Sequence, residues 1–166
     1  MHRSKYLSAK DIDPLNLDKL PVFQELHIDD LENLLAVCQL QAYVAGENII
    51  RTGTYDSWLY ILLKGKASVI VDQTEVTVLH ERGSLFGEAA LIENSSRKAD
   101  IIAQTDCECL RIDSVLMKEI LCTTNMMFYA HFYKHITEML SIRLAATSEE
   151  LTLVKKAFDH FIEQDH

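Results

Sequence analysis

Gly87, Glu88 and, nine residues later, Arg97 are the residues whose types and spacing could bind a ligand. A glycine has no Cβ, so the backbone can approach a ligand closely. The Arg97 guanidinium can present parallel N–H donors to phosphate oxygens, whereas an ionised Glu88 only accepts hydrogen bonds and suits a sugar hydroxyl. A short helix expected over residues 89–93 would add N–H groups and the positive end of its dipole. The pattern predicts a site for a small cyclic phosphate without a catalytic group.

The stretch FGEAALIENSSRKADIIA, residues 86–103, resembles the phosphate-binding cassette of the cyclic nucleotide-binding domain family. That family includes regulatory subunits of the cyclic-AMP-dependent kinase, cyclic-nucleotide-gated channels and the bacterial catabolite activator protein. Many members have Pro before the arginine and a hydroxyl residue shortly after it, whereas this chain has Ser96, Lys98 and Asp100. The resemblance extends beyond the cassette, since the apolar runs before it are separated by Gly46, Gly53, Gly65 and Gly83, as turns in a small β-roll require. In all it covers roughly residues 20–151.

The resemblance implies an α+β fold, an antiparallel, jelly-roll-like β-roll with flanking helices and a long C-terminal helix. The ligand-binding residues that it implies in the cassette are Leu85, Phe86, Gly87, Glu88, Ala89, Ala90, Arg97, Lys98 and Ala99. In the long helix it implies Arg143, Thr147 and Ser148, because this stretch looks like the helix of the catabolite activator whose Thr and Ser contact the adenine. The alternative for Thr147 is a hydrogen bond from its hydroxyl to a carbonyl one turn earlier.

Three parts are expected along the chain: an N-terminal arm over 1–17, the β-roll with short helices over 18–124, and the long helix over 125–163. Asp29 and Glu32 look like a capping box for a helix from about 30 to 41. Asp113 is a good N-cap for a helix to about 121. Apolar runs and a hairpin at residues 72–74 predict strands near 41–44, 48–51, 58–64, 67–71, 75–79, 98–103 and 108–112.

The long helix has an apolar seam whose members alternate by steps of four and three residues, which is a heptad pattern. Its members are Met126, Ala130, Tyr133, Thr137, Leu140, Leu144, Thr147, Leu151, Val154, Phe158 and Phe161. Such a seam predicts a parallel helix pair between two protomers. The alternative is a helix that folds back on its own β-roll.

Composition argues against several classes of function. The net charge of −9 disfavours a broad nucleic-acid or membrane surface, and no apolar run reaches the ~18–20 residues that span a bilayer. The four cysteines, which include Cys107 and Cys109 on one strand face, favour buried thiols in a reducing cytoplasm. His131 and His135 are spaced like metal ligands, but no third ligand is obvious, so no metal is expected. No Ser-His-Asp order, Walker-type loop or paired carboxylates suggest catalysis, so no enzyme activity is expected.

The sequence therefore predicts a cytoplasmic sensor of a cyclic nucleotide that dimerises through its C-terminal helix and signals to an unidentified protein partner. Cyclic AMP is the favoured regulatory ligand, with no other cofactor, and cyclic GMP is less favoured because no Thr stands beside Arg97. The rival is a scaffold with a non-binding pocket, which Ser96 and Asp100 support. A DNA-binding regulator is disfavoured, since only about fifteen residues follow Leu151.

Overall fold

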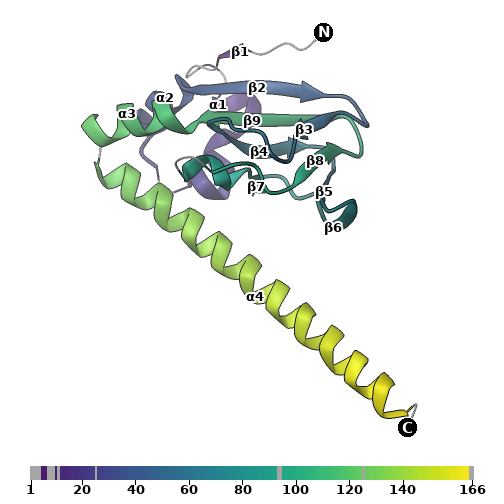
Figure 1. Ribbon diagram of the computed structural model, residues 1–166. Coiled ribbons are helices and arrows are strands. Elements are labelled where there is room, and N and C mark those ends of the chain that lie inside the picture. The colour runs from purple at the N-terminus through teal and green to yellow at the C-terminus, as the bar shows by residue number, and fades with distance from the viewer. Residues whose placement is uncertain are drawn as a thin grey trace. The chain divides into compact units, whose positions relative to one another are not determined.

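The computed structural model describes residues 5–6, 10, 12–24, 26–92, 95–124 and 126–164. The chain divides into two compact units, Met1–Tyr129 and Ala130–His166, and each is described by itself (Figure 1). The sequence-derived boundaries at residues 17 and 124 remain predictions. Among the described residues, no helix is both long and apolar enough to cross a membrane.

The described strands of the first unit form two antiparallel sheets. The five-stranded sheet has the order β1 (Lys5–Tyr6), β2 (Cys38–Tyr43), β9 (Cys107–Asp113), β4 (Trp58–Lys64) and β7 (Leu85–Phe86). The four-stranded sheet has the order β3 (Asn48–Ile50), β8 (Asp100–Ala103), β5 (Ala67–Val71) and β6 (Thr74–Leu79). With the helices described below, this arrangement confirms the predicted α+β fold built on an antiparallel β-roll.

The core lies between the two sheets. Tyr60 and Leu62 of β4 pack in one buried cluster with Ile101 and Ala103 of β8. Leu59 and Ile61, which alternate with them along β4, are buried as well. Strand β4 is therefore covered on both faces, which explains why its sequence is a continuous apolar run without the polar alternation of a half-exposed strand.

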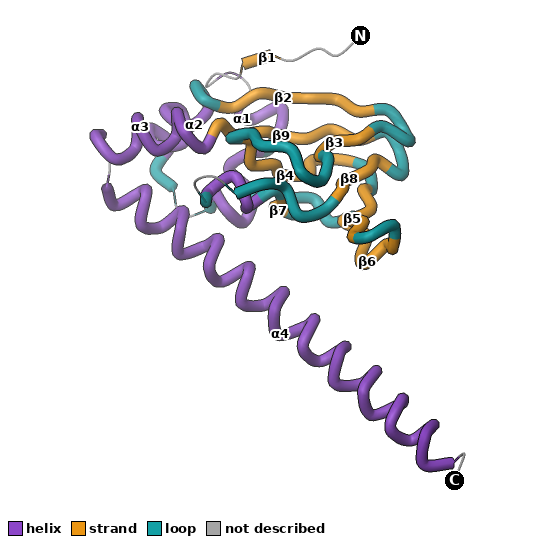
Figure 2. Tube along the Cα trace, in the orientation of Figure 1, coloured by secondary structure: helices purple, strands orange, loops and turns teal. Residues whose placement is uncertain are grey.

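The described helices are short except for the last. They are α1 (Ile12–Leu15), α2 (Ile28–Leu35), α3 (Ser114–Thr124) and α4 (Met126–Gln164), with 3₁₀ turns η2 (Leu17–Lys19), η3 (Pro21–Phe23) and η4 (Glu88–Leu91). Helix α2 contacts β2 and α3 contacts β9, so both lie at one end of the five-stranded sheet (Figure 2).

The predicted helix over 30–41 was wrong at both ends. Helix α2 begins at Ile28, and its N-cap His27 makes no side-chain capping bond, so the capping box is absent. The helix ends at Leu35, and the next strand begins at Cys38. Residues 38–43 pair with β9 in register, Cys38 opposite Ile112. This pairing with a distant strand outweighs the helical spacing of the apolar residues, because it satisfies the same backbone groups and fills the sheet.

Local signals at the other elements were confirmed. Strands β4 and β5 have the predicted bounds. Asp72 and Gln73 have φ angles of 47° and 65°, as a type I′ hairpin turn requires. The Asp113 carboxylate accepts hydrogen bonds from the N–H groups of Val115 at 3.0 Å and Leu116 at 3.3 Å, so it caps α3.

Helix α4 is a single continuous helix of 39 residues, as the absence of Gly and Pro predicted. Phe132 and Ile136 are its buried apolar side chains near the N-terminal end. Farther along, the described chain leaves large seam side chains exposed: Leu144, Leu151, Val154, Phe158 and Phe161.

Candidate functional site

Arg97 is held in place by its backbone. Its N–H donates to the Thr54 carbonyl at 2.9 Å, and its carbonyl accepts from the Gly53 N–H at 2.9 Å. These two bonds join residue 97 to the turn that follows β3, just before β8 begins at Asp100. The side chain of Arg97 is buried, so this anchored backbone places a cationic group inside the roll.

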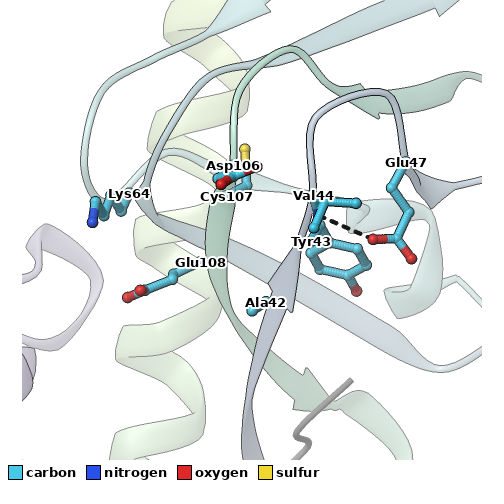
Figure 3. Close-up of a pocket in the computed structure, with 8 residues that line it drawn as sticks. All are labelled: Ala42, Tyr43, Val44, Glu47, Lys64, Asp106, Cys107 and Glu108. Carbon is cyan, nitrogen blue, oxygen red and sulfur yellow. Dashed lines mark hydrogen bonds between the residues drawn. The ribbon is translucent and has the colours of Figure 1, made fainter. Parts of the chain in front are cut away.

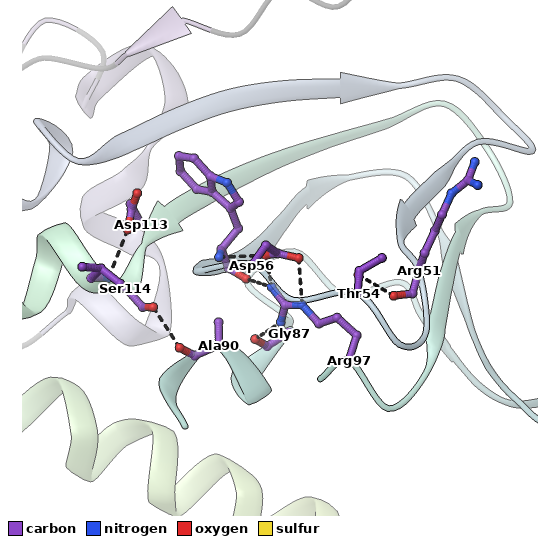
Figure 4. A network of polar contacts seen from close by, with 10 residues as sticks. Arg51, Thr54, Asp56, Gly87, Ala90, Arg97, Asp113 and Ser114 are labelled. Carbon is purple, nitrogen blue, oxygen red and sulfur yellow. Dashed lines mark hydrogen bonds and ion pairs between the residues drawn. The ribbon is translucent and has the colours of Figure 1, made fainter. Parts of the chain in front are cut away.

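The Arg97 guanidinium already has acceptors inside the protein (Figure 4). Nε donates to Oδ2 of Asp56 at 3.1 Å, and Nη2 donates to Oδ1 of Asp56 and to the Trp58 carbonyl. Nη1 donates to the Gly87 carbonyl at 2.5 Å. The structure therefore brings Arg97 to Gly87, as the sequence predicted, and adds a carboxylate partner that the sequence did not reveal. Asp56 lies 41 positions before Arg97, too far for any spacing rule to connect them.

Gly87 joins β7 to the turn η4. Its φ of 77° lies in the left-handed region that favours glycine. A Cβ at this position would lie 3.0 Å from Nη1 of Arg97 and 3.1 Å from side-chain atoms of Ile50 and Tyr60. The glycine is thus needed both for the backbone turn and for the close approach of Arg97.

The short helix of the cassette is one 3₁₀ turn, Glu88–Leu91, whose Ala90 N–H donates to the Gly87 carbonyl at 3.0 Å. The predicted helix over 89–93 was therefore displaced by one residue at its start, and residue 93 lies outside the described residues. Glu88, Ala89 and Ala90 are half-buried. A single turn has few aligned peptide dipoles, so Arg97 supplies the main positive charge here.

Leu85 and Phe86 of β7 are buried beneath this turn. The Phe86 ring stacks on Tyr60, with 5.2 Å between ring centroids. Burial and then the Asp56 carboxylate raise the pKa of Tyr60, while Arg97 and Arg111 oppose the rise. The residues brought close to the cassette thus include Asp56 and Tyr60, which sequence spacing did not identify.

The residues after Arg97 face different surroundings. Lys98 is exposed and donates to Oγ of Ser96 at 3.3 Å, while Ala99 is half-buried. The Asp100 carboxylate accepts from the Thr52 N–H at 2.8 Å. The partner of this carboxylate is thus a backbone N–H of the turn that follows β3. Asp100 stabilises the turn on which Arg97 is anchored.

Arg143, Thr147 and Ser148 belong to the second unit. Arg143 is half-exposed, and Thr147 and Ser148 are exposed in the described chain. The Thr147 hydroxyl donates to the Arg143 carbonyl at 3.0 Å, which is the alternative that the sequence left open. A ligand-binding role for these three residues stays a prediction.

A cavity of about 410 Å³ lies elsewhere in the first unit, between the β2–β3 turn and the start of β9 (Figure 3). Its lining includes the carboxylates of Glu47, Asp106 and Glu108 and one ammonium group, that of Lys64. Glu47 accepts from the Val44 N–H and Asp106 from the Ala45 N–H, so both hold the turn. An acidic lining disfavours a phosphate in this cavity.

Within the described part of the chain, no group of three His, Cys, Asp or Glu residues could hold a metal ion. Cys38, Cys107 and Cys109 are buried and unbridged, and burial raises the pKa of the Cys38 and Cys109 thiols. These cysteines are poor nucleophiles, because a raised pKa keeps the thiol protonated.

Comparisons with known proteins match a part of the chain that includes the residues described above. The family described as cyclic nucleotide-binding domain matches residues 40–123. A cGMP-dependent protein kinase of Plasmodium berghei is 30% identical over 135 residues, 81% of this chain and 16% of that relative. A cAMP-dependent protein kinase regulatory subunit of Candida albicans is 29% identical over 137 residues, 81% of this chain and 30% of that relative. The chain thus spans less than a third of either relative.

A solved cyclic nucleotide-binding domain from Methylobacillus flagellatus has a similar fold. The TM-score is 0.73 with 15% sequence identity, covering 89% of this chain and 86% of that one. At this identity the likeness concerns the fold alone.

Proposed function

We propose that this chain, which belongs to the cyclic nucleotide-binding domain family, is a sensor that binds cyclic AMP in its cassette. The observation that carries the proposal is the buried Arg97 guanidinium, held beside Gly87 and paired with the Asp56 carboxylate. Asp56 supplies the negative charge that a ligand phosphate would supply. Binding then exchanges one anion for another, so the guanidinium does not lose a charged partner.

Four of the five Arg97 N–H groups have acceptors among the described residues, which leaves one on Nη1. A phosphate that used only this N–H would gain little. A phosphate that displaced Asp56 would form the two-point, charge-assisted contact that guanidinium groups favour. The proposed ligand-bound state therefore has Asp56 turned away from Arg97, and Glu88 accepting from a ribose hydroxyl.

The preference for cyclic AMP rests on position 98. Lys98 is exposed and carries no hydroxyl, so the residue beside Arg97 lacks the threonine hydroxyl that would favour cyclic GMP. The similar proteins include a cGMP-dependent protein kinase and a cAMP-dependent protein kinase regulatory subunit, so the family alone does not choose between the two nucleotides.

Signalling is proposed to pass through α4 to a second copy of the chain and to a partner protein in the cytoplasm. The exposed seam residues Leu151, Val154 and Phe158 form an apolar stripe that a second helix would cover. Glu150 precedes a seam position and Lys155 follows one, so in a parallel pair Glu150 of one helix faces Lys155 of the other. This charge match favours the parallel arrangement.

The test is calorimetric titration of the full chain with cyclic AMP, cyclic GMP and cyclic di-GMP. Arg97→Ala should weaken cyclic AMP binding roughly ten- to hundredfold, because a hydrogen bond to a charged group contributes about 1.5–3 kcal/mol. Lys98→Ala, which removes an exposed neighbouring charge, is the matched comparison and should weaken cyclic AMP binding far less than Arg97→Ala. Equal affinities of wild type and Arg97→Ala would reject this site.

A second candidate function is a dimeric scaffold with a closed pocket. The buried pair of Arg97 and Asp56 favours it, because the guanidinium is satisfied without a ligand. Under this alternative the wild-type chain binds none of the three nucleotides, and self-association through α4 persists.

A further inference from the structure

Ser114, the first residue of α3, connects two parts of the candidate site. It is a polar residue with only 6% of its surface exposed. Its hydroxyl donates to the Ala90 carbonyl at 2.9 Å, and its N–H donates to the Ser57 carbonyl at 2.8 Å. Figure 4 shows the Ser114 side chain pointing at Ala90 in the turn that contains the cassette residues.

Both partners lie next to groups that hold Arg97. Ala90 belongs to the turn η4, and its own N–H donates to the Gly87 carbonyl, which also accepts from Arg97. Ser57 stands between Asp56 and Trp58, whose oxygens accept from Arg97. One residue at the start of a helix is therefore bonded to the two segments that surround the guanidinium.

The cap of α3 does not need the Ser114 hydroxyl. The Asp113 carboxylate accepts from the Val115 and Leu116 N–H groups and so supplies the N-terminal capping bonds. The Ser114 hydroxyl instead donates to Ala90, 24 positions earlier, in the turn η4, which is called the cassette turn below. A buried hydroxyl in this position joins two elements and adds nothing to the cap itself.

We propose that Ser114 is a positioning residue, which fixes the cassette turn to α3 so that ligand binding at the turn is transmitted to the first turn of that helix. The proposal rests on the proposed function for its ligand. If a phosphate displaces Asp56 from Arg97, the segments at Ser57 and Ala90 shift relative to each other, and Ser114 cannot keep both bonds unchanged. Transmission then requires only that the ligand bind the shifted arrangement more tightly.

The experiment uses the full chain with cyclic AMP as the probe and combines titration with amide hydrogen exchange. In the wild type, cyclic AMP should change exchange in both 85–92 and 114–124. In Ser114→Ala, affinity should fall roughly two- to tenfold, as for one lost hydrogen bond. The ligand-induced change in 85–92 should remain, while the change in 114–124 should be lost.

Asp113→Ala is the matched control. It removes the cap, so exchange in 114–124 should be faster with and without ligand, yet the ligand-induced difference should remain. Ser114→Cys is the second variant, to be used if Ser114→Ala fails to fold. Its side chain has nearly the same volume as serine but only a weak S–H donor, so the effects expected for Ser114→Ala should also be seen with it. Wild-type affinity together with a wild-type response of α3 in these Ser114 variants would overturn the proposal.

Failure of the proposed function gives a different result. If the wild type binds no cyclic nucleotide, ligand-free exchange decides the role of Ser114. Faster exchange of both 85–92 and 114–124 in Ser114→Ala would support the connection, and a change confined to 114–124 would reject it.

Discussion

Arg97 and Asp56 form a two-point ion pair in which the arginine is the buried partner. The Arg97 side chain is 2% exposed and that of Asp56 is 32% exposed. Asp56 can therefore turn toward solvent at much lower cost than Arg97, so in the proposed ligand-bound state the carboxylate is the partner that moves.

Asp56→Asn should destabilise the ligand-free chain and strengthen its response to cyclic AMP. Breaking a fully buried pair costs about 3–5 kcal/mol, and the partial exposure of Asp56 should bring the loss below that range. The phosphate then has no competing carboxylate, so the rise in melting temperature with cyclic AMP should exceed that of wild type. Thermal melts with and without nucleotide measure both effects. A smaller rise in the variant would contradict the exchange of anions.

Gly87→Ala should unfold at lower urea concentration and lose nucleotide affinity. The left-handed backbone costs roughly 1–2 kcal/mol for a residue with a Cβ, and the new methyl also crowds Arg97, Ile50 and Tyr60. Gly46→Ala is the matched control, since its φ is 85° but a Cβ there has no heavy atom within 4 Å. A larger loss of stability in Gly87→Ala than in Gly46→Ala would measure the cost of the crowding. Equal losses would show that backbone conformation alone accounts for the glycine.

Glu150→Lys should weaken self-association, because in a parallel pair the new lysine side chain at position 150 would face Lys155 of the other helix and repel it. Each exposed pair contributes about 0.2–1 kcal/mol, and two symmetric pairs should change the dimer dissociation constant several-fold at low salt. Sedimentation equilibrium measures it. Glu150→Lys combined with Lys155→Glu in one chain should restore the wild-type value. Loss without restoration would argue against the parallel register.

The free energy of unfolding should fall as pH rises above about 8.5, the ordinary pKa of a thiol. Burial raises the pKa of Cys38 and Cys109, so the folded state holds these protons after the unfolded state has released them. The contribution of these thiols to the free energy of unfolding is therefore constant below that pH and decreases by about 1.4 kcal/mol per pH unit for each thiol above it. Urea unfolding between pH 7 and 9.8 checks the slope. Cys109→Ala should make this slope shallower by about 1.4 kcal/mol per pH unit, which is the contribution of one thiol.

Some of this protein is determined by short stretches of its sequence. The spacing of Gly87 and Arg97 predicted that these two residues lie together, and residues 72–74 predicted the hairpin. The long helix followed from a heptad pattern without Gly or Pro. These features were predictable because their signals lie among neighbouring residues, where backbone conformation and side-chain spacing act directly.

Other features were decided only by the tertiary structure. Asp56 meets Arg97, and Ser114 meets Ala90, because antiparallel pairing of distant strands brings these segments together. The same pairing turned residues 38–41 from a predicted helix into the start of β2. Nothing near these residues in the sequence specifies their partners, since strand register is set by how two sheets bury a common core. The sequence thus determined which polar and charged groups the chain carries, and the fold determined that the Asp56 carboxylate is the one that pairs with Arg97.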